Sequence, residues 1–306
     1  MKLSLLLLNQ VGIMLILMSI GYYTYKKGFF SSEGSKDFGS ILMYVVTPMV
    51  VIKSFSIEYT QEKTWLLFIS FLLAIVAQGL SIIVAYVFFK KDKVLNFATA
   101  FPSTGFIGIP LVYNTLGPSA VFFIVSYATL TSIGQWTYGI LTLTGDRKML
   151  HISKITKNPM VVFTLIGLLL YFTQVQLPGL VTQTVNYIAP LNTPLAMFVI
   201  GGFIARIPLK EIFNNLKIYF SSFIRLIFIP ILTAIILLLI PSSSETFATM
   251  KIAVLIVASA PVGVNITIFA QKYGQDAGES VKVVCLSALL SIITIPMILY
   301  LYTLFA

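Results

Sequence analysis

Two apolar stretches of the chain are each interrupted by proline and glycine, and these interruptions carry the residues that could bind a ligand. The first lies between Phe101 and Leu111 and reads FPSTGFIGIPL, and the second lies between Ala258 and Thr267 and reads ASAPVGVNIT. Proline has no amide hydrogen to donate, and glycine has no side chain that favours a helix. Each interruption therefore leaves backbone N–H and C=O groups unpaired. Where a helix restarts, its free N–H groups and its dipole can bind an anion without any charged side chain.

Neutral polar side chains lie close to both interruptions and could complete such an anion site. Alternatively, each of them bonds back to the preceding helical turn or packs as a small residue, as is common in membrane helices. Two interrupted apolar segments in matching positions of two halves are the best sequence indication of a transporter's binding site. The candidates are Ser103, Thr104, Gly105, Gly108, Pro110 and Asn114 in the first segment, and Asn265 and Thr267 in the second.

Three longer polar side chains lie deep in other apolar segments. Arg225 lies ~12 Å along its helix from Lys217. Burying a cation in the bilayer is costly, so an intramembrane charge indicates a function by default, here an anionic substrate. The alternative is that Arg225 reaches the headgroups or pairs with backbone carbonyls. Gln78 and Gln135 could line the binding cavity or join neighbouring helices, since an unpaired buried amide costs roughly 2–7 kcal/mol.

The composition indicates an integral membrane protein. Of the 306 residues, 58% are hydrophobic and 10% are charged, whereas soluble domains contain about 25% charged residues. The net charge of +10 falls in short loops, where it reflects topology rather than nucleic-acid binding. No hydrolytic, phosphate-binding or redox motif is present, so neither an enzyme nor a bound cofactor is expected. The single Cys285 and the single His151 give no basis for an intramolecular disulfide or a metal site.

The acidic residues all lie in loops or at the ends of apolar segments. A carrier driven by sodium or protons usually needs a carboxylate inside the membrane. None of the ten Asp and Glu residues of this sequence is placed there. Coupling through a buried acid is therefore disfavoured, although asparagine and backbone carbonyls could still bind an ion.

Ten segments are long enough to cross a hydrocarbon core, which takes ~20 residues per helix. The seventh is expected to be bent, because Pro190 and Pro194 interrupt its first half. Most of the 20 Lys and Arg residues follow the odd-numbered segments, which places those loops in the cytoplasm and both termini outside the plasma membrane. The expected spans are 5–25, 38–57, 64–89, 94–116, 118–144, 158–175, 181–206, 213–240, 247–272 and 278–304.

The widest charged loop, from Gly145 to Lys157, divides the spans into five plus five. An odd number of spans in each half gives the halves opposite orientations. Thr47-Pro48 in the second span has a counterpart in Thr193-Pro194 in the seventh. We therefore expect two inverted five-helix repeats, 1–148 and 149–306.

Several of these motifs resemble those of the auxin efflux carrier family, over essentially the whole chain. The string GFIGIPL is followed by Gly117, and APxxxN and FAxxYG occur near the end. The stretch from Arg225 to Pro230 is also similar. The family includes plant auxin exporters and bacterial permeases proposed to carry malate or malonate, and its fold is similar to that of bile acid:sodium symporters.

The resemblance implies an all-α protein with ten membrane helices in two inverted five-helix repeats, in which broken helices four and nine cross. Spans one, two, six and seven would form a scaffold that dimerises, and spans 3–5 and 8–10 a transport domain that moves like an elevator. The substrate would be an organic anion held near the crossover. The positions implied are Ser103 to Pro110, Gln135, and Pro261 to Asn265 with Val262 and Gly263.

One departure from the family pattern concerns specificity. The family often has asparagine just before the GFIGIP run, where this chain has Ser103 and Thr104. A shorter hydroxyl makes fewer hydrogen bonds, so specificity for auxin-like compounds or dicarboxylates does not follow from the resemblance.

These observations predict a secondary transporter of small organic anions that works by alternating access around the crossover, surrounded by membrane lipid. Three alternatives remain at this point. The first is a sodium-coupled symporter of the bile acid type, which the missing carboxylates disfavour. The others are a membrane sensor that binds the ligand without transporting it, and an open pore.

Overall fold

The computed structural model describes residues 2–150 and 152–306, so His151 lies outside the described residues. Within the described part every extended element is a helix, and the one β-type contact is an isolated bridge. The first half contains α1 (Lys2–Lys26), α2 (Ser32–Ile41), α3 (Thr47–Phe55), α4 (Gln61–Phe89), α5 (Lys93–Ala100), α6 (Ile109–Leu116), α7 (Pro118–Gly134) and α8 (Ile140–Thr144).

The second half follows a short 3₁₀ turn at Arg147–Met149. It contains α9 (Ile152–Thr156), α10 (Pro159–Thr173), α11 (Gly179–Ile188), α12 (Asn192–Arg206), α13 (Leu209–Ile212), α14 (Leu216–Phe223), α15 (Ile229–Leu238), α16 (Glu245–Ala258), α17 (Asn265–Lys272) and α18 (Ala277–Phe305).

Three pairs of helices are joined by wider, π-helical turns, a fourth π-helical turn opens α6, and a 3₁₀ turn joins a further pair. The 3₁₀ turn at Ala189–Leu191 connects α11 to α12 and confirms the bend expected in the seventh span. A π-turn forms where one extra residue is accommodated inside a helix, and such turns are frequent at functional sites. The π-helical turns are Leu42–Val46, Thr104–Gly108, Gln135–Gly139 and Ile224–Phe228.

Helices on both sides of the molecule begin at polar caps. The side chain of Asp92 accepts a hydrogen bond from the Leu95 amide at the start of α5, at 3.0 Å. Ser244 does the same for Phe247 at the start of α16, at 3.1 Å. Such caps satisfy amide groups that have no partner inside the helix. They fix the outer ends of the two helices that lead into the interruptions.

Seven helical segments of the described chain are long and apolar enough to cross a membrane, which supports a helical membrane protein. Of the three other predicted spans, 94–116 and 247–272 are interrupted by non-helical residues. The third, 118–144, is helical throughout but carries Gln135 and several hydroxyl residues. That ten segments cross the membrane therefore stays a prediction. The seven segments are Leu5–Lys26, Ser32–Phe55, Gln61–Phe89, Arg147–Thr173, Gly179–Arg206, Leu216–Leu238 and Ala277–Phe305.

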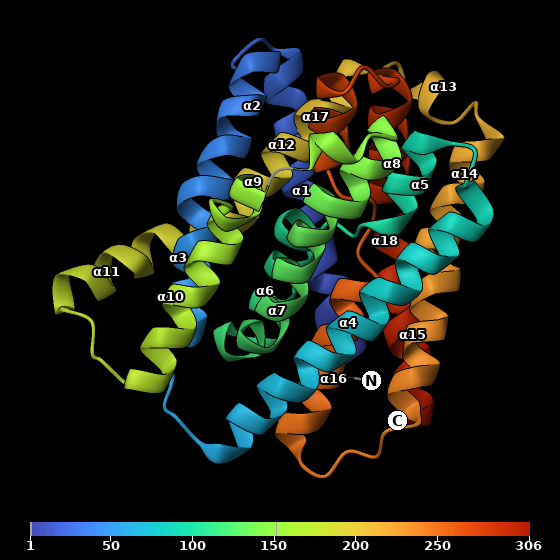
Figure 1. The fold of residues 1–306 in the computed structure, drawn as a ribbon. Coiled ribbons are helices and arrows are strands. Elements are labelled where there is room, and N and C mark those ends of the chain that lie inside the picture. The colour runs from blue at the N-terminus through green and yellow to red at the C-terminus, as the bar shows by residue number, and fades with distance from the viewer. Residues whose placement is uncertain (1, 151) are drawn as a thin grey trace.

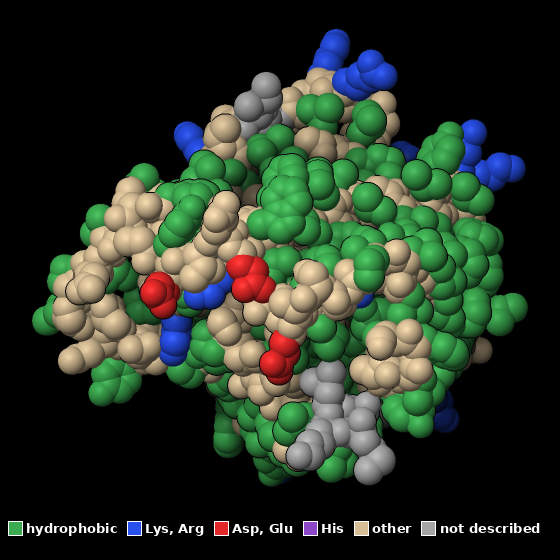
Figure 2. Space-filling view, turned by 90° about the horizontal axis from the view of Figure 1, so that it is seen from below, with side chains coloured by type: hydrophobic (Ala, Val, Ile, Leu, Met, Phe, Trp, Pro, Cys, Tyr) green, Lys and Arg blue, Asp and Glu red, His purple; other side chains and the backbone are tan. Residues whose placement is uncertain are grey.

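Both marked ends of the chain lie at the same, lower end of the molecule in Figure 1. The connections from α3 to α4 and from α15 to α16 also lie at that end, whereas the connection from α1 to α2 lies at the upper end. Seen from below in Figure 2, acidic side chains lie within the face, and most of the visible Lys and Arg lie at its rim. This arrangement agrees with the expectation that the two termini share one side.

The helices of spans one, two, six and seven pack together. Helix α1 lies along α12, α2 also contacts α12, and α3 contacts α10 and α11. The α1–α12 contact brings backbone against backbone, because a Cβ atom on Gly21 would lie 2.7 Å from the Cα atom of Phe198. A Cβ atom on Gly201 would collide with the carbonyl oxygen of Met18. Small residues allow membrane helices to approach this closely.

Candidate functional site

The two interruptions lie against each other in the structure. Pro102 and Val262 form an antiparallel bridge. The amide of Ser103 donates to the Pro261 carbonyl at 2.7 Å, and the amide of Gly263 donates to the Phe101 carbonyl at 3.0 Å. Each interruption thus supplies hydrogen-bond partners that the other lost when its helix broke. This mutual pairing satisfies the requirement that backbone groups at membrane depth find partners inside the protein.

Gly263 allows the two chains to approach this closely. A Cβ atom at this position would lie 3.2 Å from the carbonyl oxygen of Pro102 and 3.3 Å from that of Phe101. Both are backbone atoms, which a neighbouring rotamer change cannot move. A side chain at residue 263 would therefore push the two interruptions apart.

Each restarted helix is accessible at its first turn. Gly105 is the one partly exposed residue between Phe101 and Leu111, and a Cβ atom built on it meets no atom within 4 Å. Asn265 is partly exposed in the second interruption, where its neighbours are buried. The amide groups of these two residues donate to no other group of the described chain. Open space therefore adjoins free N–H groups, which is the arrangement expected of an anion site.

Two side-chain amides meet beside the bridge. Asn265 donates through Nδ2 to Oε1 of Gln135 at 2.9 Å. Gln135 is 4% exposed and lies in the π-helical turn that follows α7. Its Nε2 atom would be 3.5 Å from a Cβ atom on Gly263. Residues of the fifth and ninth predicted spans are thereby brought together on one side of the bridge.

Three buried oxygen atoms in the two interruptions have no hydrogen-bond partner among the described residues, namely Oγ of Ser103, Oγ of Ser259 and Oδ1 of Asn265. Leaving a buried polar atom unpaired costs roughly 1–3 kcal/mol, so a hydrogen-bond partner at these oxygen atoms would be favourable. Thr104, the next residue after Ser103, is also buried. These oxygen atoms would pair with a hydroxyl or a protonated group of a bound molecule.

Gln78 and Arg225 bind the carboxyl-terminal ends of α5 and α16, the two helices that lead into the interruptions. Gln78 donates to the Ala100 carbonyl at 2.9 Å and accepts from the Thr131 hydroxyl at 2.9 Å. The guanidinium of Arg225, which is fully buried, donates to the carbonyls of Thr99 and Ala258. Two roles were left open for each residue by the sequence. In the structure Arg225 pairs with backbone carbonyls, and Gln78 joins neighbouring helices.

The remaining candidates lie farther from the bridge or bond to their own helix. Asn114 lies on α6, ~15 Å along the chain from Thr104, and donates to Thr193 of α12 at 2.8 Å. Thr267 donates to the Val264 carbonyl at 2.9 Å, which is the back-bonding considered from the sequence. Pro110 occupies the first turn of α6. A Cβ atom on Gly108 would lie 3.4 Å from the Val257 side chain, so Gly108 serves the packing of α6 against α16.

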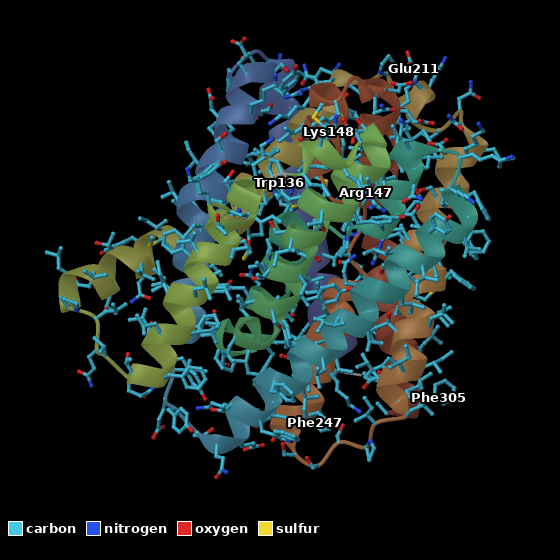
Figure 3. All side chains as sticks on the ribbon, viewed as in Figure 1. Trp136, Arg147, Lys148, Glu211, Phe247 and Phe305 are labelled. Carbon is cyan, nitrogen blue, oxygen red and sulfur yellow. The ribbon has the colours of Figure 1, made fainter. Side chains whose placement is uncertain are left out.

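The sequence did not single out an aromatic and basic cluster next to Gln135. The side-chain nitrogens of Lys154 and Lys272 lie 5.6 and 5.7 Å from the ring centre of Trp136. Trp136 also packs edge-on against Phe269, one helical turn beyond Asn265, with ring centres 4.9 Å apart. Figure 3 shows Trp136 in the upper half of the molecule, toward the end that carries Arg147 and Lys148. The adjacency of Trp136 to Gln135 in the sequence was the available signal.

Comparison with known proteins shows one family over nearly the whole chain. The family described as membrane transport protein matches residues 6–299. The chain belongs to this family, the auxin efflux carrier family. It is therefore a multi-pass membrane transporter and not an enzyme. The motifs around the two interruptions had indicated the same family.

Several distant relatives are similar to this chain, two of them over nearly its whole length. "Uncharacterized transporter YfdV" of Escherichia coli (strain K12) is 21% identical over 303 residues and covers 94% of both chains. "Putative malonate transporter" of Rhizobium meliloti (strain 1021) is 24% identical over 300 residues, and the match covers 93% of this chain and 92% of that protein. "Uncharacterized transporter MJ1031" of Methanocaldococcus jannaschii is 24% identical over 209 residues, covering 63% of this chain and 68% of that one.

Proposed function

We propose that this member of the auxin efflux carrier family transports a small organic anion, a carboxylate in the size range of malonate or malate. The observation that carries the proposal is the bridge between the two interrupted helices. Beside it, Gly105 and Asn265 combine free amide groups with partial exposure. Neutral donors of this kind, together with the dipoles of the restarted helices, attract a carboxylate.

The substrate would lie against the first turns of the restarted helices. Ser103, Thr104 and Gly105 would contact it from one helix, and Asn265 from the other, with Gln135 as its side-chain neighbour. The name of the Rhizobium meliloti relative supports malonate as the first compound to test. The departure at Ser103 and Thr104 leaves the choice among carboxylates to experiment.

Alternating access would follow from movement of one group of helices against the other. The scaffold in this proposal consists of α1, α2, α3, α10, α11 and α12, and the bridge belongs to the moving group. An apolar crevice lined by Met14 of α1, Leu111 of α6 and Ile295 of α18, among others, separates the two groups locally. The lining of this crevice is mostly apolar, and one polar contact between the two groups, from Asn114 to Thr193, would have to break during the movement.

The remaining features of the proposal concern symmetry and placement. Asn192, the residue before Thr193, donates to the Thr47 hydroxyl at 3.3 Å, so the Thr-Pro pairs of the two halves lie next to each other. This contact supports an inverted repeat of 1–148 and 149–306. We further propose a homodimer formed through the scaffold helices, located in the plasma membrane with both termini outside. The concentration of Lys and Arg away from the termini supports that orientation.

A binding assay tests the proposal. The purified protein is heated with malonate, malate, citrate, indole-3-acetate or taurocholate, each with sodium and with choline as the counter-ion. One carboxylate is expected to raise the unfolding midpoint in both salts, because bound ligand stabilises the folded state. Asn265→Ala should reduce the rise, whereas the matched control Asn186→Ala, an exposed asparagine of α11, should leave it unchanged.

Flux measurements in proteoliposomes separate the alternatives. Saturable uptake that is accelerated by unlabelled substrate on the opposite side supports a carrier and excludes an open pore. A stabilising ligand that shows no counterflow would indicate a sensor. Stabilisation that requires sodium would indicate a symporter of the bile acid type.

A further inference from the structure

A buried guanidinium joins the carboxyl-terminal ends of α5 and α16, the two helices that lead into the interruptions. Arg225, in the π-helical turn Ile224–Phe228, donates through Nη1 to the Thr99 carbonyl at 3.2 Å, and through Nη2 to the Ala258 carbonyl. Thr99 lies one residue before the end of α5, and Ala258 is the last residue of α16. Nη1 also reaches the Ser81 hydroxyl of α4 at 3.3 Å. One side chain thus holds three elements from two halves of the chain.

A positive charge is stabilised at these two helix ends. The last carbonyls of a helix have no partner in the helix and carry the negative end of its dipole. Here two such ends converge within the reach of one side chain. In transporters with discontinuous helices, carbonyls of this kind coordinate the sodium ion or proton that drives transport. In this chain the position is already occupied by a positive group of the protein itself.

The charge of Arg225 has no acidic partner in the described structure. The one ion pair described joins Lys282 to Glu211 near the surface, at 3.0 Å. No Asp or Glu is buried among the described residues, and Tyr127, also fully buried, is the other titratable group facing the guanidinium. The positive charge is therefore balanced by carbonyl dipoles, and no carboxylate of the described chain neutralises it.

We propose that Arg225 is a fixed internal substitute for a co-transported cation, so that the carrier binds neither sodium nor a proton at the crossover. The inference rests on the proposed transport function and specifies its coupling. It also makes a prediction about the chain itself. Removing the guanidinium leaves the carbonyl oxygens of Thr99 and Ala258 and the hydroxyl of Ser81 around a vacated buried space. Oxygen ligands of this kind suit a small hard cation.

The test uses thermal unfolding in sodium, lithium, potassium and choline chloride at equal ionic strength, without any substrate. The wild-type protein is expected to unfold at the same temperature in all four salts. Arg225→Ala should unfold at a lower temperature in choline, and sodium or lithium should raise its midpoint saturably, by roughly 2–4 °C. Arg225→Lys, which keeps a cation, should show no such rise. Arg206→Ala, which removes a partly exposed arginine elsewhere, is the matched control and should be insensitive to the cation.

Two outcomes overturn the inference. The first is a saturable stabilisation of the wild-type protein by sodium over choline. The second is an Arg225→Ala protein that folds but responds to no cation. If Arg225→Ala does not fold, Arg225→Met replaces it with the same expected sodium response, because methionine keeps the packing of the arginine stem but ends short of the guanidinium position beside the carbonyls. Counterflow of the stabilising carboxylate should also be equal in sodium and choline and unaffected by a proton ionophore. Because the thermal assay needs no substrate, its result is independent of whether the proposed carboxylate is correct.

Discussion

The side-chain amide of Asn265 donates a hydrogen bond of 2.9 Å to the side-chain oxygen of Gln135, and this contact joins the second interrupted helix to the predicted fifth span. The bond orients both amides beside the bridge. Their remaining polar atoms, including the unpaired Oδ1 of Asn265, are then available to a substrate.

Asn265→Ala and Gln135→Ala should each weaken binding of the stabilising carboxylate by about 10- to 150-fold, since one hydrogen bond to a charged group contributes about 1.5–3 kcal/mol. The double variant should lose less than the sum of the two single losses, because the residues act as a pair. Isothermal titration measures the three affinities. Strict additivity would show that the two side chains do not cooperate. Gln183→Ala, at an exposed glutamine of α11, controls for loss of an amide.

Gly263→Ala should destabilise the folded protein by about 1–3 kcal/mol, the usual cost of forcing an extra atom into a packed site. The added methyl would press on the carbonyl oxygens of Phe101 and Pro102. Urea or thermal unfolding in detergent gives the difference. Gly79→Ala in α4, where a Cβ atom meets no atom within 4 Å, should be tolerated. Equal stability of the two variants would contradict the close approach at the bridge.

Gln78→Leu should lower stability by about 1–3 kcal/mol, because it leaves the Ala100 carbonyl and the Thr131 hydroxyl without their partner. It should leave the dissociation constant of the carboxylate within about twofold, since Gln78 serves the end of α5. Parallel unfolding and titration experiments separate the two effects. A large loss of affinity with unchanged stability would show instead that Gln78 contacts the substrate.

A covalent link between α6 and α12 should stop transport if these helices move against each other. Asn114 and Thr193 are in side-chain contact at 2.8 Å, one on each side of the proposed moving boundary. Cysteines replacing both, in a background carrying Cys285→Ala, should abolish counterflow on oxidation and restore it on reduction. Either cysteine alone should respond to neither treatment. Full activity of the oxidised, cross-linked protein would exclude sliding at this boundary.

The positions of the interruptions were predictable from the sequence because proline and glycine act locally. The same holds for the bend near Pro190 and Pro194. The start of the second span was predicted less accurately. The prediction placed it at residue 38, whereas helix α2 already begins at Ser32. The side chain of Ser31 caps it by accepting from the amides of Glu33 and Gly34, and this polar cap outweighs the lack of apolar residues in the first turns.

The pairings that give these residues their roles were not predictable from one sequence. Nothing near Arg225 indicates that its partners are the carbonyls of Thr99 and Ala258, which are distant in the chain. Backbone carbonyls carry no sequence signal, so a buried arginine suggested a substrate as readily as a helix end. The pairing of Asn265 with Gln135 likewise depends on how the two halves pack.

The bridge has a consequence for synthesis of the protein. The amide of Ser103 and the carbonyl of Phe101 receive their partners only after Pro261 and Gly263 have been made. Until then the first interrupted helix must enter the bilayer with these groups unpaired, or remain near the insertion machinery and its water. Apolar side chains do not provide hydrogen-bond partners for these backbone groups. We therefore expect a ribosome-bound chain that ends before α16 to be degraded rapidly, and a separately supplied second half to rescue it.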